Sequence, residues 1–224
     1  MVFVGRRAET TQIIQELNRK NNVILFGKHG IGRTALLKHL AQLNPKHHRF
    51  VFADFSQACS EVSRVLFAQL FPKENARRLG EYVAYKWARF RIAKHALPDK
   101  REHVLVLDNI ARLTHQKLDL IRYLEFEKRF RFVGIVETFL DPDDLFSLRA
   151  ALIPVSTIKL DSLDDASVEK FFRHYSEQQG WQWSEEDIET LVSSVGGYPL
   201  RMAEIVARHM QKHKATWKAE TQRA

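Results

Sequence analysis

Short apolar runs alternate along the chain with longer amphipathic segments, and this alternation limits the fold more than any other feature. The short runs are rich in Val, Ile, Leu and Phe and are too short for helices, so we expect buried strands. Helical patterns separate these runs. The sequence therefore predicts an α/β fold with a five-stranded, mostly parallel sheet, covered by helices on both faces. The predicted strands are 23–26, 50–54, 104–108, 132–136 and 155–160.

After residue 160 the strand pattern stops, and three helical segments follow. Asp164 starts the first of these segments and Ser184 precedes the second, and both are predicted to be N-caps. The 224 residues are thus expected to form an α/β domain over 1–160 and a smaller helical domain over 161–224. The helices predicted along the whole chain are 7–20, 33–43, 60–71, 75–97, 113–124, 143–151, 164–178, 185–194 and 199–213.

A glycine-rich loop joins the first predicted strand to the next helix. From Gly27 to Thr34 it fits the pattern GxxxxGK[ST], except that Arg33 replaces lysine. Glycines allow backbone N–H groups to surround a phosphate, and the helix N-terminus adds partial positive charge. The Thr34 hydroxyl would ligate Mg²⁺. We expect bound ATP or ADP with Mg²⁺; the alternative is a glycine-rich turn before a helix. The predicted nucleotide-binding residues of the loop are Gly27, Lys28, His29, Gly30, Ile31, Gly32, Arg33, Thr34 and Ala35.

Two cations in this loop need separate consideration. Arginine is longer than lysine and fork-shaped, so Arg33 can preserve phosphate binding while impairing the positioning that hydrolysis requires. Lys28 either adds charge at the rim of the loop, which we favour, or reaches a phosphate across a dimer. The second behaviour resembles the deviant loops of the MinD-like ATPases.

A second chemical pattern lies at the end of the third predicted strand. The run 103–109 ends in Asp108-Asn109 and resembles the Walker B pattern hhhhD[DE]. Asp108 would complete the metal shell, or else cap a turn at the strand end. Asn109 stands where a glutamate would activate water, and an amide cannot accept a proton at neutral pH. The sequence therefore predicts weak or slow hydrolysis.

The fourth predicted strand also ends in polar residues. This strand end resembles the place where related P-loop ATPases carry a sensor of the γ-phosphate, and the resemblance implies that role for Thr138. Glu137 precedes it and offers a carboxylate, although strand alternation directs the two side chains to opposite faces. Thr138 is thus the preferred candidate for a catalytic role.

Taken together, these motifs resemble an AAA+ or STAND-type P-loop ATPase, a group that includes archaeal-type, origin-recognition and transposition-regulator ATPases. The N-terminal Phe3-Val4-Gly5-Arg6-Arg7 is similar to the "FVGRE" box, and 196–201, GGYPLR, is similar to a "GGxP" sensor 2 element. The resemblance implies that Gly5 and Arg6 lie near the adenine. It also implies that Pro199 and Arg201 belong to a lid that closes over the nucleotide.

The same resemblance suggests a role for Arg149. This residue precedes the last predicted strand, where many AAA+ proteins carry an arginine finger for a neighbouring subunit. Asn109, Thr138 and Arg149 are therefore the candidate catalytic residues, and the chain is a candidate homo-oligomer.

Basic residues outnumber acidic ones by 35 to 27, and the resulting charge of +8 favours anionic partners. Segment 75–101 interleaves cations with aromatic residues and is a candidate DNA-binding face on which Arg89 and Arg91 would be exposed. The alternative is an amphipathic helix that packs its aromatic side on the core. The tail from Arg208 to Arg223 is also basic, and such tails are usually solvated.

Several classes of protein are disfavoured. No apolar run approaches the roughly 18 residues that span a bilayer, and the first residues lack a signal-peptide pattern. The single cysteine, Cys59, cannot form an internal disulfide, and the ten histidines have no metal-ligand spacing. We therefore expect a cytoplasmic protein without a membrane partner.

The leading hypothesis is an ATP-binding AAA+/STAND-like switch that hydrolyses slowly and whose output is assembly or docking, either on a protein partner or on DNA. The main alternative is a pseudo-ATPase scaffold with structural nucleotide or none. A small-molecule kinase is disfavoured because the GGxP element has no role there.

Overall fold

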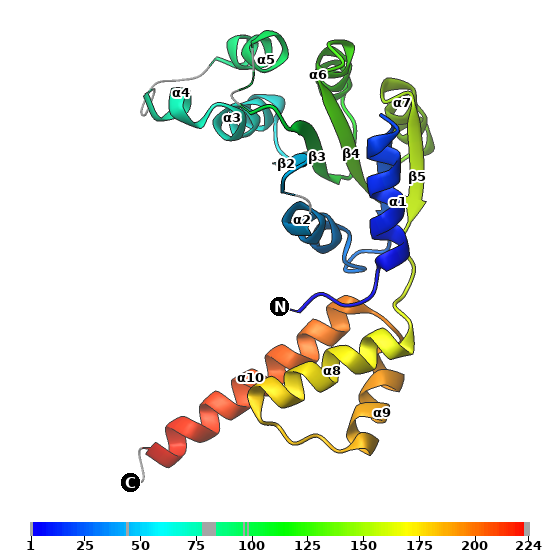
Figure 1. Cartoon of the computed structure of the whole chain (residues 1–224), viewed down its shortest axis with the longest axis vertical. Helices are drawn as coiled ribbons and strands as arrows, with labels where there is room; N and C mark the ends of the chain where they lie inside the picture. The colour runs from blue at the N-terminus through cyan, green and yellow to red at the C-terminus, as the bar shows by residue number, and fades with distance from the viewer. Residues whose placement is uncertain (1, 44, 78–83, 96, 98, 222–224) are drawn as a thin grey trace. The chain divides into compact units, whose positions relative to one another are not determined.

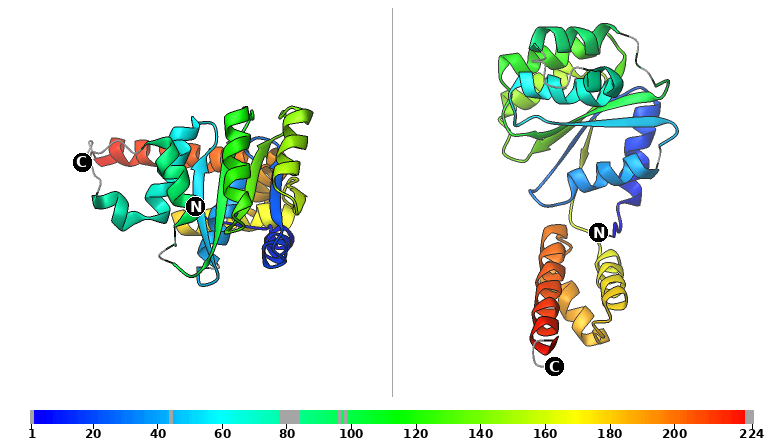
Figure 2. Two further views of the ribbon diagram at one scale, coloured as in Figure 1. Left: turned by 90° about the horizontal axis from the view of Figure 1, so that it is seen from above. Right: turned by 90° about the vertical axis from the view of Figure 1, so that its left-hand side faces the viewer.

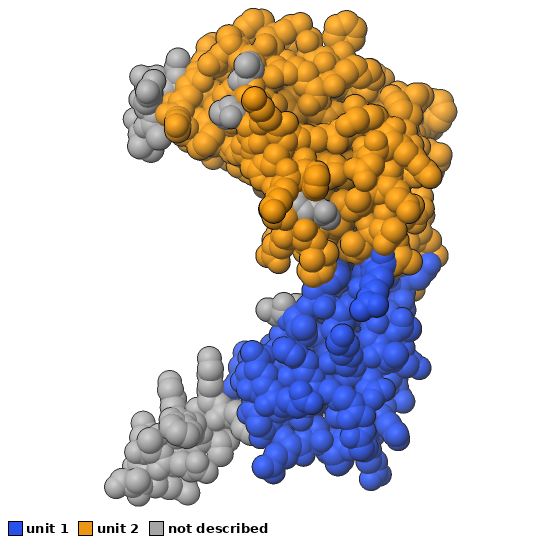
Figure 3. Space-filling model, viewed as in Figure 1, with its two compact units in different colours: residues 1–7, 29–32, 161–224 blue, residues 8–28, 33–160 orange. Residues whose placement is uncertain are grey.

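The computed structural model describes residues 2–43, 45–77, 84–95, 97 and 99–221, without the side chains of 76, 77 and 212–221. The chain divides into two compact units, which are coloured in Figure 3. The helical unit comprises residues 1–7, 29–32 and 161–224, and the α/β unit comprises 8–28 and 33–160. The domains expected from the sequence, 1–160 and 161–224, differ from these units in the placement of 1–7 and 29–32.

The α/β unit contains a five-stranded sheet in the order β2-β3-β4-β1-β5, and every pairing is parallel. The α/β fold predicted from the sequence is confirmed. The middle residues of β1, β3 and β4 are mostly apolar and buried, as expected for a parallel sheet covered on both faces. The strands are β1 (Asn22–Gly27), β2 (His48–Asp54), β3 (Glu102–Ile110), β4 (Phe130–Glu137) and β5 (Val155–Lys159).

Helices cover both faces of this sheet. Figures 1 and 2 show α1 and α2 on one face and α3, α5, α6 and α7 on the other. The long crossover from β1 to β2 passes β4 and β3, so the end of β1 lies beside the end of β4. The helices of the α/β unit are α1 (Arg7–Asn18), α2 (Arg33–Leu43), α3 (Cys59–Leu70), α4 (Pro72–Arg77), α5 (Tyr85–Lys94), α6 (His115–Phe126) and α7 (Pro142–Ala151).

The prediction of a single helix over 75–97 is wrong. Helix α4 ends at Arg77, and α5 begins only after Ala84, whose backbone is extended (φ −61°, ψ 135°). Part of the predicted helix, 78–83, lies outside the described residues. Trp87 of α5 packs edge-on against Phe67, with 5.1 Å between ring centroids. Tyr85 and Trp87 therefore pack against the core, as the amphipathic alternative predicts, whereas Phe90 is 50% exposed.

The helical unit is built on α8 (Asp165–Gln179), α9 (Glu185–Val195) and α10 (Pro199–Thr221). Both predicted N-caps are confirmed. The Asp164 side chain accepts a hydrogen bond from the Ser167 N–H, and Ser184 forms a reciprocal capping box with Asp187. Phe172 belongs to this unit's core and is fully buried. Among the described residues, no helix combines the length and apolar character needed to cross a bilayer.

Candidate nucleotide and metal site

Thr34 and Asp108 are brought together at one edge of the sheet. Thr34 lies in the first turn of α2, and Asp108 lies near the end of β3. The Thr34 Oγ1 lies 2.9 Å from Asp108 Oδ2 and 3.2 Å from Oδ1. A hydroxyl beside a carboxylate supplies the hard oxygen ligands that Mg²⁺ prefers, and Mg²⁺ usually takes its remaining ligands from water and phosphate. These two side chains therefore fit a magnesium site of that kind.

Asn109 follows Asp108 in a strained conformation. Its φ is +58°, in the left-handed region, and the pairing of β3 with β4 is irregular at this point. The Asn109 N–H donates to Asp108 Oδ1 over 2.9 Å, and its side-chain Nδ2 donates to Asp54 Oδ1 over 3.1 Å. The amide at the position of the expected base is thus oriented toward the end of β2.

Asp54 is a member of this group that the sequence analysis missed. It ends β2, which pairs with β3 so that Asp54 and Asp108 are register partners. Burial would raise the pKa of Asp54, but hydrogen bonds from Ser56, Asn109 and Gln57 outweigh burial and lower that pKa. The sequence predicts that Asp54 ends a strand, but only the strand order places it beside Asp108.

Arg33, the residue before Thr34, contacts the end of β4, the strand next to β3. Its Nη2 lies 2.6 Å from Glu137 Oε1, and its Nη1 donates to the Val136 carbonyl. The two charged side chains are 6% and 11% exposed. Glu137 and Gly27 are register partners on β4 and β1. The arginine that replaces the expected lysine is therefore engaged by the protein itself.

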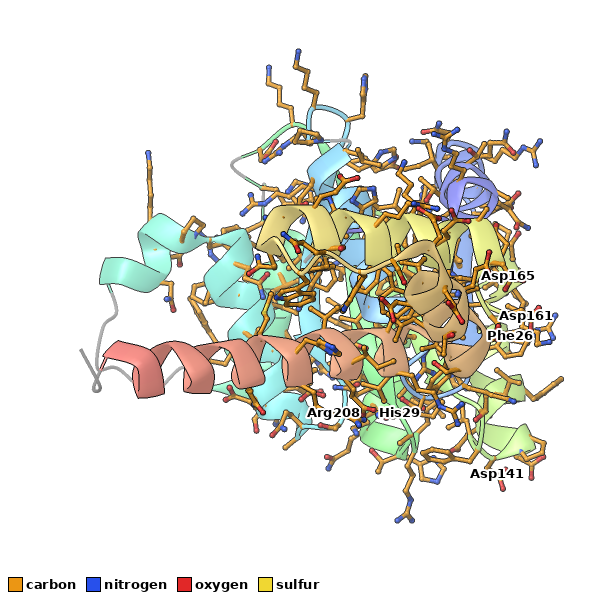
Figure 4. The ribbon with its side chains drawn as sticks, turned by 90° about the horizontal axis from the view of Figure 1, so that it is seen from below. Phe26, His29, Asp141, Asp161, Asp165 and Arg208 are labelled. Atoms are coloured by element: carbon orange, nitrogen blue, oxygen red, sulfur yellow. The ribbon has the colours of Figure 1, made fainter. Side chains whose placement is uncertain are left out.

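Thr138 and Arg149 are not joined to these contacts. Thr138 is exposed in the turn after β4. Arg149 is exposed in the last turn of α7, whose N-cap is Asp141 (Figure 4). Arg149 lines an apolar groove of about 650 Å³ between α7 and the start of β5. Their predicted catalytic roles remain predictions.

Within the helical unit, the middle of the glycine-rich loop packs against the start of α10. Gly30 and Gly32 have φ of +78° and +95°, which explains the need for glycine. The Leu200 N–H donates to the Gly30 carbonyl over 3.2 Å, and a Cβ on Gly30 would lie 2.7 Å from the Leu200 Cβ. A Cβ on Gly32 would lie 3.8 Å from Pro199 Cγ. The predicted loop and sensor 2 residues are thus neighbours.

The N-terminal box contacts the same loop. Arg6 is 8% exposed, and its Nη2 donates to the carbonyls of Ile31, over 3.3 Å, and Asp161, over 2.5 Å. Gly5 has φ +68°, and a Cβ there would lie 2.8 Å from Leu163. In this structure Arg6 ties the N-terminal box to the loop and to the segment before α8. Its predicted place near an adenine remains a prediction.

The remaining predicted binding residues differ in exposure. Lys28, His29 (labelled in Figure 4) and Ala35 are exposed, whereas Gly27 and Ile31 are buried. Exposed Arg201 lies with its guanidinium carbon 5.9 Å from the Tyr198 ring centroid. Among the described residues, no three His, Cys, Asp or Glu side chains cluster as a metal site.

The described cations of segment 75–101 are largely engaged by neighbours. Arg91 binds Glu74 through three contacts of 2.8–3.2 Å, with one quarter of each side chain exposed. The Arg89 guanidinium lies 4.5 Å from the Tyr123 ring centroid. The expectation that Arg89 and Arg91 are freely exposed is therefore wrong. Two further pairs are Lys94–Glu127 and Arg101–Asp99.

Comparison with known proteins places this geometry in a family. A family model for the AAA ATPase domain matches residues 2–129. A search of curated proteins found no match. The structure of the Aeropyrum pernix Orc1 protein in complex with DNA is similar with a TM-score of 0.61 at 14% identity, covering 93% of this chain and 62% of that one. This chain therefore corresponds to less than two thirds of that protein's length.

A second solved structure, Cdc6p from Pyrobaculum aerophilum, has a TM-score of 0.48 at 17% identity and covers 75% of this chain and 48% of that one. At these identities the likeness to Orc1 concerns the fold alone. The family model, however, covers more than half of the sequence, including the glycine-rich loop and the strand that carries Asp108. The chain is a member of the AAA ATPase domain family.

Proposed function

We propose that this chain binds ATP or ADP together with Mg²⁺ and acts as a nucleotide switch that hydrolyses ATP slowly. The observation that carries the proposal is the hydrogen bond between Thr34 Oγ1 and Asp108. These residues are 74 positions apart, and they supply the hydroxyl and the carboxylate on which magnesium binding in such loops depends.

Thr34 and Asp108 would hold the metal, and the backbone N–H groups of the loop would hold the phosphates. When bound, Mg²⁺ neutralises phosphate charge and orients the terminal phosphate. Thr34 is fixed by its place in the first turn of α2, where the helix also presents unpaired N–H groups to an anion. The protein therefore contributes orientation and positive potential at this end of the loop.

Slow hydrolysis follows from the residues available to activate water. Asn109 cannot accept a proton, and its amide is oriented by Asp54. Glu137 has a carboxylate, but that group is paired with Arg33. Neither side chain offers a free base in this structure. A nucleotide-dependent change of state is therefore a better supported output than rapid turnover.

Calorimetric titration with ATP, in the presence and absence of Mg²⁺, tests the proposal. Thermal unfolding with and without nucleotide is the second measurement. A ligand at 100 times its Kd adds about 2.7 kcal/mol of stability, so millimolar Mg-ATP should raise the thermal midpoint by about 5 °C or more. The variant Asp119→Asn is a control that should bind Mg-ATP like the unmodified chain. Asp119 is an exposed carboxylate on α6, and its oxygen lies 4.0 Å from an Arg122 nitrogen. Absence of binding with and without Mg²⁺ would favour the scaffold without nucleotide.

DNA association is a second candidate function. It is supported by the net charge of +8 and by the A. pernix Orc1 structure, in which that protein is in complex with DNA. The engaged cations Arg89 and Arg91 are poor candidates for phosphate contacts, whereas Lys86 and Lys100 are exposed. Phosphate contacts would make binding fall steeply with salt concentration.

Fluorescence anisotropy with a labelled duplex, measured across a salt series with and without ATP, tests this candidate. The expected result is binding that Lys86→Glu and Lys100→Glu weaken. Light scattering of the same samples reports whether ATP drives assembly. If no binding is seen at physiological salt, or if binding is independent of salt, the DNA candidate is rejected and a protein partner is favoured.

A further inference from the structure

The ion pair between Arg33 and Glu137 differs from the other ion pairs described in the α/β unit by its burial and by its position. Both of its side chains are almost fully enclosed, at 6% and 11% exposure. Arg33 uses Nη2 for Glu137 and Nη1 for the Val136 carbonyl, so the planar guanidinium is held by two acceptors at the end of β4. Such bidentate restraint suits arginine and not lysine.

The location of Glu137 connects this pair to the glycine-rich loop. Glu137 is the last residue of β4 and is the register partner of Gly27, the first glycine of the loop. A carboxylate there opposes an approaching polyphosphate, because like charges repel strongly where water is excluded. Arg33 neutralises this charge only while it remains paired with Glu137.

The pair is also incompletely satisfied. Among the described residues, Glu137 Oε2 is buried without a hydrogen-bond partner, so the carboxylate depends on Arg33. Arg33 has five N–H donors, and its two recorded bonds engage only part of them. One guanidinium is therefore available to two anions, the Glu137 carboxylate and a phosphate, and strengthening one contact weakens the other.

We propose that Glu137 is a positioning residue that withholds Arg33 from the nucleotide phosphates and so sets the nucleotide affinity of the loop. The inference rests on the proposed nucleotide binding and adds its regulation. Removing the Glu137 charge releases the guanidinium to phosphate and tightens binding. The competing account is a purely structural pair that ties α2 to β4 and leaves phosphate binding to the backbone alone.

Glu137→Gln is the principal test, because glutamine keeps the shape and one acceptor oxygen while removing the charge. Calorimetric titration with Mg-ATP is expected to show a Kd about tenfold lower than that of the unmodified chain, which corresponds to about 1.4 kcal/mol. An unchanged or higher Kd would overturn the inference. Glu137→Leu is measured in parallel, and whichever variant is folded decides the outcome.

A double-mutant cycle separates release of Arg33 from simple loss of repulsion. Positioning predicts that Glu137→Gln tightens ATP binding several-fold more when Arg33 is present than in the Arg33→Gln background. Repulsion alone predicts an equal or larger gain in that background, and this result would overturn the inference. Glu74→Gln, which breaks the separate ion pair with Arg91 on α5, is the matched control and should leave Kd unchanged.

The two proposals fail in different ways. If the unmodified chain binds Mg-ATP and no Glu137 variant binds it more tightly, the inference fails and nucleotide binding stands. If neither the unmodified chain nor any variant binds, nucleotide binding fails and the inference falls with it. Thermal unfolding of each variant without nucleotide identifies any that are not folded.

Discussion

The ends of β3 and β4 each contact a residue of the first turn of α2, but they are built differently. At the end of β3, Asp108 accepts a hydrogen bond from Thr34 in a partly exposed setting that suits a metal and its water. At the end of β4, Glu137 and Arg33 form a pair that is almost fully buried. The β3 end keeps the aspartate of the hhhhD[DE] pattern. At the β4 end, the arginine that replaces the lysine of GxxxxGK[ST] contacts the protein itself.

The loop also contains positions that are constrained by the backbone and a position that is constrained by its side-chain contacts. Glycines at 30 and 32 adopt conformations that favour glycine, so these positions are constrained by the backbone. Arg33, in contrast, is constrained by its side chain, which satisfies the Val136 carbonyl and the Glu137 carboxylate. A substitution there can therefore preserve the fold and change how phosphate is handled.

The largest expected effect is the loss of stability when the Arg33–Glu137 ion pair at the end of β4 is removed. Arg33→Met should lower the free energy of unfolding by about 3–5 kcal/mol, because it leaves the Glu137 carboxylate buried without its partner. Urea denaturation measures the loss. The Arg33→Met/Glu137→Leu double variant should recover most of it. A loss below about 1 kcal/mol would show that the pair is no more than a surface salt bridge.

The next largest effect is the loss of magnesium-dependent ATP binding when Asp108, at the end of β3, is replaced. Asp108→Asn should weaken the magnesium-dependent part of ATP binding at least about tenfold, because the metal loses an anionic ligand. Titration with and without Mg²⁺ measures it, and Asp119→Asn serves as the control. If Asp108→Asn binds Mg-ATP as tightly as the unmodified chain, the metal is held elsewhere.

A third variant is designed to raise the rate of ATP hydrolysis by placing a carboxylate at position 109, at the end of β3. Asn109→Glu combined with Asp54→Asn should raise ATP turnover about tenfold or more, since a positioned general base contributes at least that much. Asn109→Glu alone should gain less, because the new carboxylate would lie near both Asp54 and Asp108. Phosphate release reports turnover. Rapid turnover by the unmodified chain would instead identify Glu137 as the first residue to test as the base.

The smallest effect concerns the opposite, amino ends of the sheet strands. Burial lowers the pKa of His48 and, on the neighbouring strand, of His103. The unfolded chain then binds protons more readily, so stability is complete above about pH 6.5 and falls as the pH decreases below it. The slope is at most about 1.4 kcal/mol per pH unit for each histidine.

Denaturation at a series of pH values between 5 and 8 checks this dependence. His103→Gln should flatten the profile, whereas His115→Gln, at an exposed position on α6, should not. An unchanged profile in His103→Gln would show that this histidine does not titrate differently in the folded chain.

The sequence predicted the sheet and the loop, because apolar periodicity and a fixed motif spacing are local signals. It assigned Thr34 and Asp108 to one metal from the chemistry of two separate motifs, and the structure places these side chains within hydrogen-bonding distance. It did not predict the partner of Arg33, because Glu137 is 104 residues away and the direction of a long side chain depends on packing. It missed Asp54 for a similar reason, since strand order brings that residue to Asp108. The break before α5 was missed because the helical pattern continues across Ala84.

The most direct test of the contrast between the two strand ends is the ¹⁵N–¹H spectrum of the arginine side chains, with the Arg33 signal assigned by its loss in Arg33→Lys. Adding Mg-ATP should shift the Arg33 signal, as phosphate competes with Glu137 for the guanidinium, and the shift should be larger in Glu137→Gln. If the chain binds Mg-ATP while the Arg33 signal stays unchanged in both proteins, Arg33 is a structural residue and the account of the β4 end is wrong.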